Sequence, residues 1–298
     1  MKIINKIKKD LKCNIKKYTF FNNVKYIETD KGNYIIKRFT NENIYQNLNR
    51  NSFDNYIDYK YEIEDYKIYP YIDSIEVDDN EKALDIIHLI SKLHVNTSYY
   101  KNISTKEIND IYEEKKNKIK VINDYYEYLR FVYEEKINFT PTELYFLKNM
   151  SIIFISLDNT LKYLDKWYQI MKDKTSQRVS MIHNNLELSH IIENNKPYLI
   201  SWDKSKYDIP IYDFVNFYKK EFNNLNFIDL ISIYKNNINI TKEELYLLYI
   251  EILLPQKIIF DNSEIKNIYE LTKEGLYLNK ANYLVLKDNE PEKTYQQN

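Results

Sequence analysis

Glycine is the scarcest informative residue in this chain. Two glycines, Gly32 and Gly275, occur in 298 residues, where average usage of about 7% would give about twenty. A glycine-rich phosphate loop, a dinucleotide-binding fingerprint and a nucleophile elbow each need clustered glycines, because the backbone must turn sharply or approach a phosphate closely. The sequence therefore excludes all three.

Cysteine and long apolar runs are also scarce. The single cysteine, Cys13, cannot form an internal disulfide, which fits a reducing compartment. No apolar run approaches the eighteen or so residues of a membrane helix, so we predict no transmembrane segment. The basic N-terminus MKIINKIKKDL lacks the apolar core and cleavage site of a signal peptide. We therefore expect a cytoplasmic protein.

Neither charge sign is in excess. The formal net charge is -1, with acidic and basic residues interspersed. Electrostatic binding of nucleic acid needs a clear basic excess on one face, so we expect no nucleic-acid partner. The 31 tyrosines accompany many Ile, Lys and Asn residues, all encodable by AT-rich codons. We interpret them as composition bias rather than a base-stacking surface.

Residues 1–75 have the pattern of a small antiparallel sheet. VKYIET and NYIIKRF are rich in β-forming residues and are joined by Asp30-Lys31-Gly32, a turn signal that predicts a hairpin. Residues 56–73 continue the alternation of polar and apolar side chains. We therefore predict a small β-rich lobe.

Residues 76–290 have a helical pattern, which begins with apolar side chains at helical spacing in EKALDIIHLISKLH. Inside this region RVSMIH and KPYLISW predict two short strands, and the polar residues 291–298 predict a disordered tail. Three helix starts match a capping box: Ser104 with Glu107, Thr140 with Glu143, and Thr241 with Glu244.

The stretch 178–214 resembles the catalytic hairpin of the aminoglycoside phosphotransferase and choline kinase superfamily. The family pattern reads H-G-D, four residues, N, then I-D-W-E and D-P-x-Y-D. This chain reads HNN, four residues, His190, then ISWD and DIPIYD in the same register. The resemblance implies an α+β, protein-kinase-like two-lobed fold, with an antiparallel β N-lobe at 1–75 and a large, mainly helical C-lobe at 76–290.

Other segments match less specifically. NYIIKRF resembles the strand that carries the family's ATP lysine, which would be Lys37. YPYID resembles the segment that links the lobes, and KLH, ending at His94, resembles the end of the first large-lobe helix. LSH before Ile191, together with DIPIYD, is closest to the spore-coat proteins of the CotS and YutH type, a degenerate branch of the superfamily.

The departures from the family pattern are at the positions that would carry out catalysis. Asn185 stands where an aspartate accepts or orients the substrate hydroxyl proton, and a neutral amide cannot act as a base. His190 and Ser201 stand at the two Mg²⁺ positions, although magnesium prefers carboxylate and other hard oxygen ligands. The phosphate-covering turn, near residues 20–24, contains no glycine.

The residues that would hold the hairpin in place are retained. By resemblance, His183, Trp202 and Asp213 tie the hairpin to the helical lobe. We therefore predict a pseudokinase without a bound cofactor, which acts as a structural or binding component with protein partners. If the spore-coat resemblance holds, those partners are other coat proteins and the protein is assembled onto the coat.

Several alternatives remain open. A phosphotransferase with rewired metal ligands would use Asp203 or Asp208 to hold Mg²⁺ for ATP. A nucleotide or metabolite sensor would use Lys37 to contact phosphate, whereas a non-functional Lys37 would be solvated or paired with an acid. Glu187 could replace the missing base, and His190 with His183 could bind a transition metal rather than serve as ordinary hydrogen-bonding residues.

Overall fold

The computed structural model describes residues 7–10, 12–21, 24–38 and 43–289. The predicted tail and the centre of the phosphate-covering turn lie outside these residues. The chain divides into two compact units, which we name by their content. The sheet unit comprises Met1–Thr97 and Met181–Tyr207, and the helical unit comprises Ser98–Ser180 and Asp208–Asn298. None of the described helices is both long and apolar enough to cross a membrane.

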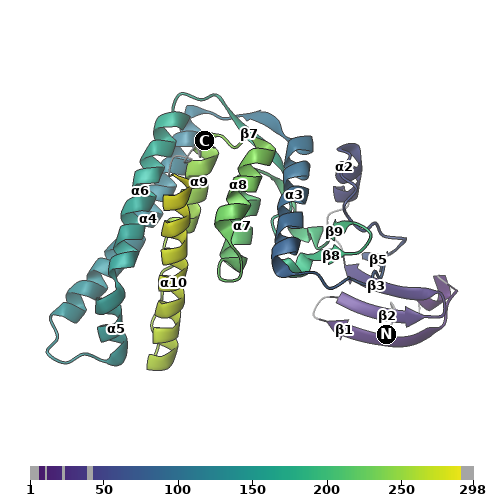
Figure 1. Ribbon diagram of the computed structural model, residues 1–298, viewed down its shortest axis with the longest axis horizontal. Coiled ribbons are helices and arrows are strands. Elements are labelled where there is room, and N and C mark those ends of the chain that lie inside the picture. Colours follow the sequence, from purple (N-terminus) through teal and green to yellow (C-terminus); the bar gives the residue numbers. More distant parts are fainter. Residues whose placement is uncertain (1–6, 11, 22–23, 39–42, 290–298) are drawn as a thin grey trace, which may run out of the picture. The chain divides into compact units, whose positions relative to one another are not determined.

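The sheet unit contains a five-stranded antiparallel sheet with strand order β1-β2-β3-β5-β4 (Figure 1). The predicted hairpin of β2 and β3 is confirmed. Gly32 has a φ of 123° in the turn, where a side chain would be strained, and the Thr29 hydroxyl donates to its carbonyl oxygen at 2.7 Å. The strands are β1 (Ile15–Phe21), β2 (Val24–Thr29), β3 (Gly32–Arg38), β4 (Tyr61–Ile63) and β5 (Tyr66–Pro70).

The pleat of β3 separates a core face from a second, half-buried face. Tyr34 and Ile36 are buried in the apolar cluster of the sheet, which also contains Ile27 and Ile68. Successive side chains of a strand point to opposite faces, so Lys37 points away from this core. The apolar pattern of β3 thus places Lys37 on the second face.

The predicted hairpin at 178–214 contributes β8 (Ile191–Glu193) and β9 (Pro197–Leu199), flanked by the short helices η1 (Leu188–His190) and η2 (Trp202–Lys204). It packs against α3 (Asp79–Thr97). Ile75 N–H donates to the Glu193 carbonyl at 2.7 Å, and Leu199 N–H donates to Asn55 at 2.9 Å.

These ties group α3 and the hairpin with the sheet. The compact units divide the chain at Thr97 and Met181, and the lobe boundary near residue 75 stays a prediction. The sheet unit also contains α2 (Ile44–Arg50).

In the helical unit, α4, α6, α9 and α10 run side by side (Figure 1). The capping boxes at Ser104 and Thr140 are complete, and at the third the Thr241 N–H donates to the Glu244 carboxylate at 3.0 Å. Strand β6 pairs antiparallel with β7, and β7 and β10 cross the boundary between the units. The elements are β6 (Tyr99–Asn102), α4 (Thr105–Glu134), α5 (Pro141–Asn149), α6 (Ser151–Met171), β7 (Ser176–Ile182), β10 (Lys206–Asp208), α7 (Ile211–Glu221), α8 (Phe227–Ile238), α9 (Lys242–Leu253) and α10 (Glu264–Asp288).

A buried ion pair joins β7 to α9. Arg178 donates through Nε and Nη2 to the two carboxylate oxygens of Glu244, at 2.7 and 2.5 Å. The side chains are only 15% and 5% exposed. A third bond, from Arg178 Nη1 to the Ile238 carbonyl at 3.1 Å, satisfies more of the guanidinium. Such complete pairing is what makes a buried charge tolerable.

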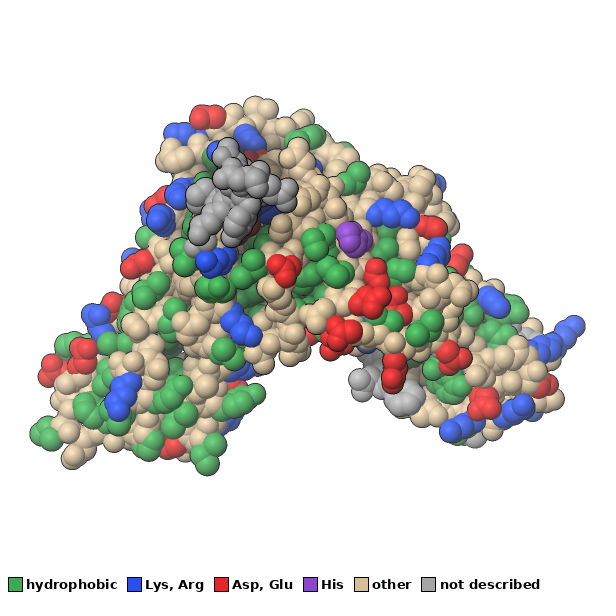
Figure 2. Space-filling view, in the orientation of Figure 1, with side chains coloured by type: hydrophobic (Ala, Val, Ile, Leu, Met, Phe, Trp, Pro, Cys, Tyr) green, Lys and Arg blue, Asp and Glu red, His purple; other side chains and the backbone are tan. Residues whose placement is uncertain are grey.

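Apolar side chains are exposed at one end of the helical unit, over α5, the end of α4 and the first half of α10 (Figure 2). Ile137 and Ile265 are 95% and 84% exposed. The group, which we call the apolar end, also contains Phe131, Leu144 and Tyr269. Exposed apolar side chains that gather in one region are more informative than single ones, because such regions often contact partners.

Candidate functional site

Most of the predicted site residues lie in one compact unit. Asp208 and Asp213 belong to the helical unit, where Asp213 is fully buried in the first turn of α7. The sheet unit contains Lys37, His183, Asn185, Glu187, His190, Ser201, Trp202 and Asp203.

His183 and Trp202 support the two sides of the hairpin from within. The His183 ring is fully buried, and its Nε2 donates to the Ile200 carbonyl at 2.8 Å. The Trp202 indole N–H donates to the Leu199 carbonyl at 2.8 Å. The two rings meet edge to face, with centroids 4.6 Å apart, a favourable geometry for aromatic pairs.

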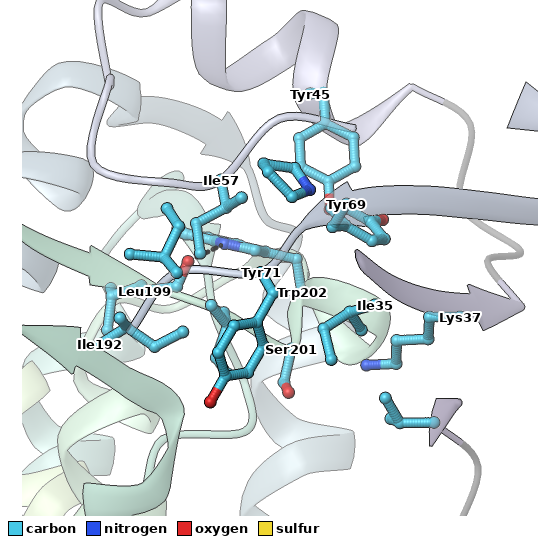
Figure 3. Close-up of a pocket in the computed structure, with 14 residues that line it drawn as sticks. Ile35, Lys37, Tyr45, Ile57, Tyr69, Tyr71, Ile192, Leu199, Ser201 and Trp202 are labelled. Carbon is cyan, nitrogen blue, oxygen red and sulfur yellow. Dashed lines mark hydrogen bonds between the residues drawn. The ribbon is translucent and has the colours of Figure 1, made fainter. Parts of the chain in front are cut away.

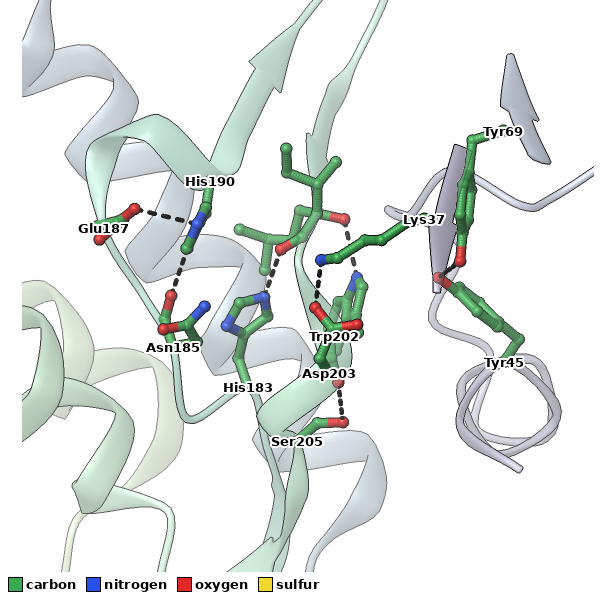
Figure 4. A network of polar contacts seen from close by, with 12 residues as sticks. Lys37, Tyr45, Tyr69, His183, Asn185, Glu187, His190, Trp202, Asp203 and Ser205 are labelled. Carbon is green, nitrogen blue, oxygen red and sulfur yellow. Dashed lines mark hydrogen bonds and ion pairs between the residues drawn. The ribbon is translucent and has the colours of Figure 1, made fainter. Parts of the chain in front are cut away.

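His190 uses both of its ring nitrogens inside the loop (Figure 4). Nδ1 lies 2.5 Å from the Asn185 carbonyl oxygen and Nε2 lies 3.0 Å from a Glu187 carboxylate oxygen. Both neighbours are acceptors, so the two bonds form together only when both nitrogens carry a proton. In this arrangement His190 has no nitrogen lone pair for a metal ion.

Glu187 is engaged on the same side of the loop. Its carboxylate contacts His190 and also accepts a hydrogen bond from the Ser189 hydroxyl at 2.6 Å. A general base must reach the proton that it removes, whereas this carboxylate is held by its neighbours. The geometry therefore favours a structural role for Glu187 over the role of a substitute base.

The described residues of the hairpin do not fit a magnesium ion. Among them, no group of three or more His, Cys, Asp or Glu side chains is arranged to hold a metal. The rings of His183 and His190 have centroids 6.3 Å apart, and His183 Nε2 donates to a carbonyl. Ser201 offers one hydroxyl oxygen, a weak ligand for a hard cation that prefers carboxylates.

Lys37 forms an ion pair with Asp203 (Figure 4). The lysine comes from β3 and the carboxylate from η2, and the side chains are 21% and 30% exposed. Of the readings open from the sequence, the structure has Lys37 paired with an acid. The same contact engages Asp203, which together with Asp208 was considered as a displaced metal ligand.

The backbone of the hairpin is unusual at two positions. Ser201 has a φ of 67° and Asn184 a φ of 58°, the left-handed region that costs most residues roughly 1–2 kcal/mol. Asparagine tolerates it best after glycine, and the Asn184 amide also donates to the Lys204 carbonyl at 3.1 Å. Serine is not among the residues that tolerate this region best, and backbone outliers of this kind cluster at functional sites.

A cavity of about 220 Å³ lies beside the ion pair, within the sheet unit (Figure 3). We call it the hairpin cavity. Its lining is mainly aliphatic and aromatic, and Ser201 and Lys37 contribute polar groups. The lining residues are Val24, Ile35, Lys37, Tyr45, Ile57, Tyr69, Pro70, Tyr71, Ile72, Ile192, Leu199, Ile200, Ser201 and Trp202.

Two tyrosines close one side of the hairpin cavity. The Tyr45 and Tyr69 hydroxyls are 2.9 Å apart and hydrogen-bond to each other. Burial raises the pKa of both, and the nearby Asp203 carboxylate raises it further, so both stay protonated. Sequence reasoning missed this pair because it treated the tyrosines together as composition bias; the position of Tyr69 in YPYID was the available signal.

No protein-family model matches this sequence, and no curated protein matches it either. Solved structures match it in fold. An aminoglycoside phosphotransferase from Alicyclobacillus acidocaldarius aligns with a TM-score of 0.66, at 9% identity, over 92% of each chain. The AMP-bound spectinomycin phosphotransferase APH(9)-Ia aligns with a TM-score of 0.55, at 14% identity, over 94% of this chain and 97% of its own.

The choline kinase LicA from Streptococcus pneumoniae aligns at 18% identity over 96% of this chain and 97% of its own, with a TM-score of 0.49. At these identities the likeness concerns architecture and not activity. The antiparallel sheet followed by a mainly helical region therefore has the two-lobed α+β fold of the kinase-like phosphotransferases.

Proposed function

We propose that this protein is a pseudokinase: a kinase-like protein without phosphotransfer activity that works by binding. The observation that carries the proposal is the Lys37–Asp203 ion pair. It engages the lysine expected to contact ATP and, in the same contact, Asp203, one of the two carboxylates considered as replacement magnesium ligands. The contact thus speaks against the use of Asp203 as a rewired magnesium ligand.

The loop supports the same proposal. Asn185 has no basic side-chain group, and His190 and Glu187 are bonded to one another within the loop. Phosphoryl transfer depends on positioning the reactants and neutralising their charge. Base and metal ligands act together in that machinery, so losing one of them removes much of what the others contribute.

The direct test is turnover. Purified protein would be incubated with ATP and either Mg²⁺ or Mn²⁺, alone and with choline, spectinomycin and gentamicin as acceptors, and ADP release would be followed. We expect no release above that of a heat-denatured sample. Metal-dependent release would overturn the proposal and favour the phosphotransferase with rewired ligands.

A ligand sensor is a second candidate, because the hairpin cavity offers an apolar site beside polar groups, the usual character of small-molecule sites. Saturable binding without turnover would support it. A sensor and a pseudokinase would both lack phosphotransfer activity. They would differ in whether the hairpin cavity binds a small molecule.

We propose protein partners for the binding role, with spore-coat proteins as the finer alternative and coat assembly as the corresponding location. The coat assignment rests on the resemblance of LSH and DIPIYD to CotS and YutH type proteins. The apolar end of the helical unit supports a protein partner more generally. Cross-linking in sporulating cells, compared with a variant carrying Ile137→Ser and Ile265→Ser, would test both ideas.

A further inference from the structure

We propose that the exposed face of α10 binds the same helix of a second copy of this chain, as a parallel, two-stranded coiled coil. The inference concerns a different surface from the hairpin and does not depend on the proposed lack of phosphotransfer activity. It rests on the spacing and area of the exposed side chains and on the charged and polar residues among them.

The exposed side chains of α10 follow the coiled-coil repeat, in alternating steps of four and three residues. The apolar ones, which we call the α10 stripe, are Ile265, Tyr269, Leu276, Tyr283 and Leu286. Exposed Thr272 and Asn279 fill the two remaining steps. Scattered exposed apolar residues are ordinary, but a row with this spacing over three heptads is the pattern of a coiled-coil seam.

The α10 stripe lies opposite the face by which α10 packs in its own unit. That packed face is buried and includes Leu271, Leu278 and Val285. In Figure 1, α10 runs along the front of the helical unit. The helix thus has one apolar face for its own core and a second that its own core does not use.

The α10 stripe is large enough for a stable dimer. Its five side chains are between 42% and 84% exposed, with a mean of about 60%. A large side chain buries about 200 Å², so the five offer about 600 Å² in each copy and about 1,200 Å² in a pair. A specific interface needs at least about 1,000 Å².

The charges beside the α10 stripe select a parallel pair. One edge of the stripe carries Lys266, Lys273, Lys280 and Lys287, each seven residues from the next. The other edge carries the uncharged residues Ile268, Gly275 and Asn282. An antiparallel pair would bring the two lysine edges together, where like charges repel, whereas a parallel pair places each lysine edge against the uncharged edge of the other copy.

The two polar positions also favour a parallel pair in register, because each then meets the same residue of the second copy. The Asn279 amide donates to the Gly275 carbonyl at 2.8 Å, and its carboxamide oxygen and second N–H can pair with the other Asn279. The Thr272 hydroxyl donates to the Ile268 carbonyl at 2.7 Å, so it can be covered without losing that bond. An antiparallel pair would set both positions against apolar side chains.

Gly275 leaves space beside the α10 stripe. Glycine inside a helix costs roughly 0.5–1 kcal/mol relative to alanine, and this chain has only two glycines. A Cβ at Gly275 would meet no atom of the described residues within 4 Å beyond its own helix. Gly275 lines a groove of about 360 Å³ between α10, α5 and the start of α6, which a second helix on the stripe would cover.

Sedimentation velocity of the full chain between about 1 and 100 µM tests self-association. We expect the mass of two chains at the upper end of this range. Leu276→Glu places two carboxylates side by side in the seam, so the dissociation constant should rise at least tenfold, about 1.4 kcal/mol. Leu286→Glu repeats the test at a more exposed position, and melting temperatures confirm that each variant folds.

The matched control is Val121→Glu, which makes the same kind of change at an exposed apolar position of α4. It should associate as the parent does. A parent chain that stays monomeric at 100 µM would overturn the inference and leave an acidic amphipathic helix of another protein as the partner to seek. Stripe variants that associate as the parent does, or a control that weakens association equally, would also overturn it.

Disulfide trapping tests the orientation. In a parallel pair the two Leu286 positions meet, so Leu286→Cys should form a disulfide-linked dimer under mild oxidation, whereas in an antiparallel pair they lie at opposite ends of the seam. The parent, whose single Cys13 is buried, is the control. A Leu286→Cys dimer that does not cross-link would overturn the parallel arrangement. ADP release by the parent would overturn the proposed function and leave this inference unchanged.

Discussion

His190 holds the backbone of Asn185, with its Nδ1 2.5 Å from the Asn185 carbonyl oxygen. The histidine at a predicted magnesium position is thus bonded to the residue at the predicted base position. The two residues that depart from the family pattern, His190 and Asn185, therefore contact each other directly. Reversing either departure alone would therefore not restore the ancestral arrangement.

We predict that Asn185→Asp alone gives less than tenfold more ADP release than the parent protein. A general base contributes typically about 10²–10⁴-fold, but only when the reactants are positioned and the metal is bound. The triple variant Asn185→Asp, His190→Asn, Ser201→Asp restores the family's residues and should show Mg²⁺-dependent ADP release. Ser201 has a φ of 67°, which aspartate tolerates well. Turnover by the single variant would contradict the view that several parts are missing.

The buried pair of Arg178 and Glu244 should dominate the stability of its region. We predict that Arg178→Met lowers the free energy of unfolding by about 3–5 kcal/mol, because it leaves the Glu244 carboxylate buried without its main partner. The matched control is Arg38→Met, whose pair with Asp65 is 67% and 66% exposed and should be worth at most about 1 kcal/mol. Urea unfolding measures both, and equal losses would contradict the argument.

Glu251 should stabilise the helical unit at neutral pH. Burial alone would raise its pKa, but Lys115 and Lys219 outweigh burial and lower it; the Lys115 ammonium is 2.6 Å away. A folded pKa below the unfolded value gives stability that is present at neutral pH and is lost as the pH falls through the folded pKa. We therefore predict that Glu251→Gln costs about 1–3 kcal/mol at pH 7, between the values for exposed and buried pairs.

The cost of Glu251→Gln should shrink below about pH 4, as the parent carboxylate becomes protonated. Urea titrations at pH 7 and pH 3.5 would measure it. Glu113→Gln, on the exposed surface of α4, is the control and should change stability little at either pH. A cost that stays constant with pH would show that the charge of Glu251 does not matter.

Short sequence patterns predicted much of the fold. Asp30-Lys31-Gly32 specified the β2–β3 hairpin because a turn with positive φ selects glycine. Three capping-box patterns marked helix starts because each uses residues only three apart. Such signals are short in sequence, so one chain suffices to read them.

Long-range contacts could not be read in the same way. Lys37 and Asp203 are 166 residues apart, and the sequence left open whether the lysine was solvated, paired or bound to phosphate. The hairpin cavity needs β3, the lobe-linking segment and the hairpin to come together, and each contributes side chains that look like ordinary core residues. The grouping of α3 with the sheet likewise depends on packing rather than on local propensity.

Glu274 should show the opposite pH dependence to Glu251. Burial raises its pKa, while its carboxylate accepts a hydrogen bond from Gln256 N–H at 2.8 Å. A raised folded pKa means that the folded state binds the proton more tightly, so stability falls as the pH rises above the unfolded pKa, near 4.3.

Glutamine at position 274 would keep an acceptor for the Gln256 N–H without the charge. We predict that Glu274→Gln is at least as stable as the parent at pH 7 to 8, and that the advantage fades below about pH 4. Unfolding midpoints in urea across that range measure the difference. A loss of stability that is largest at pH 8 would show instead that the folded protein needs the Glu274 charge.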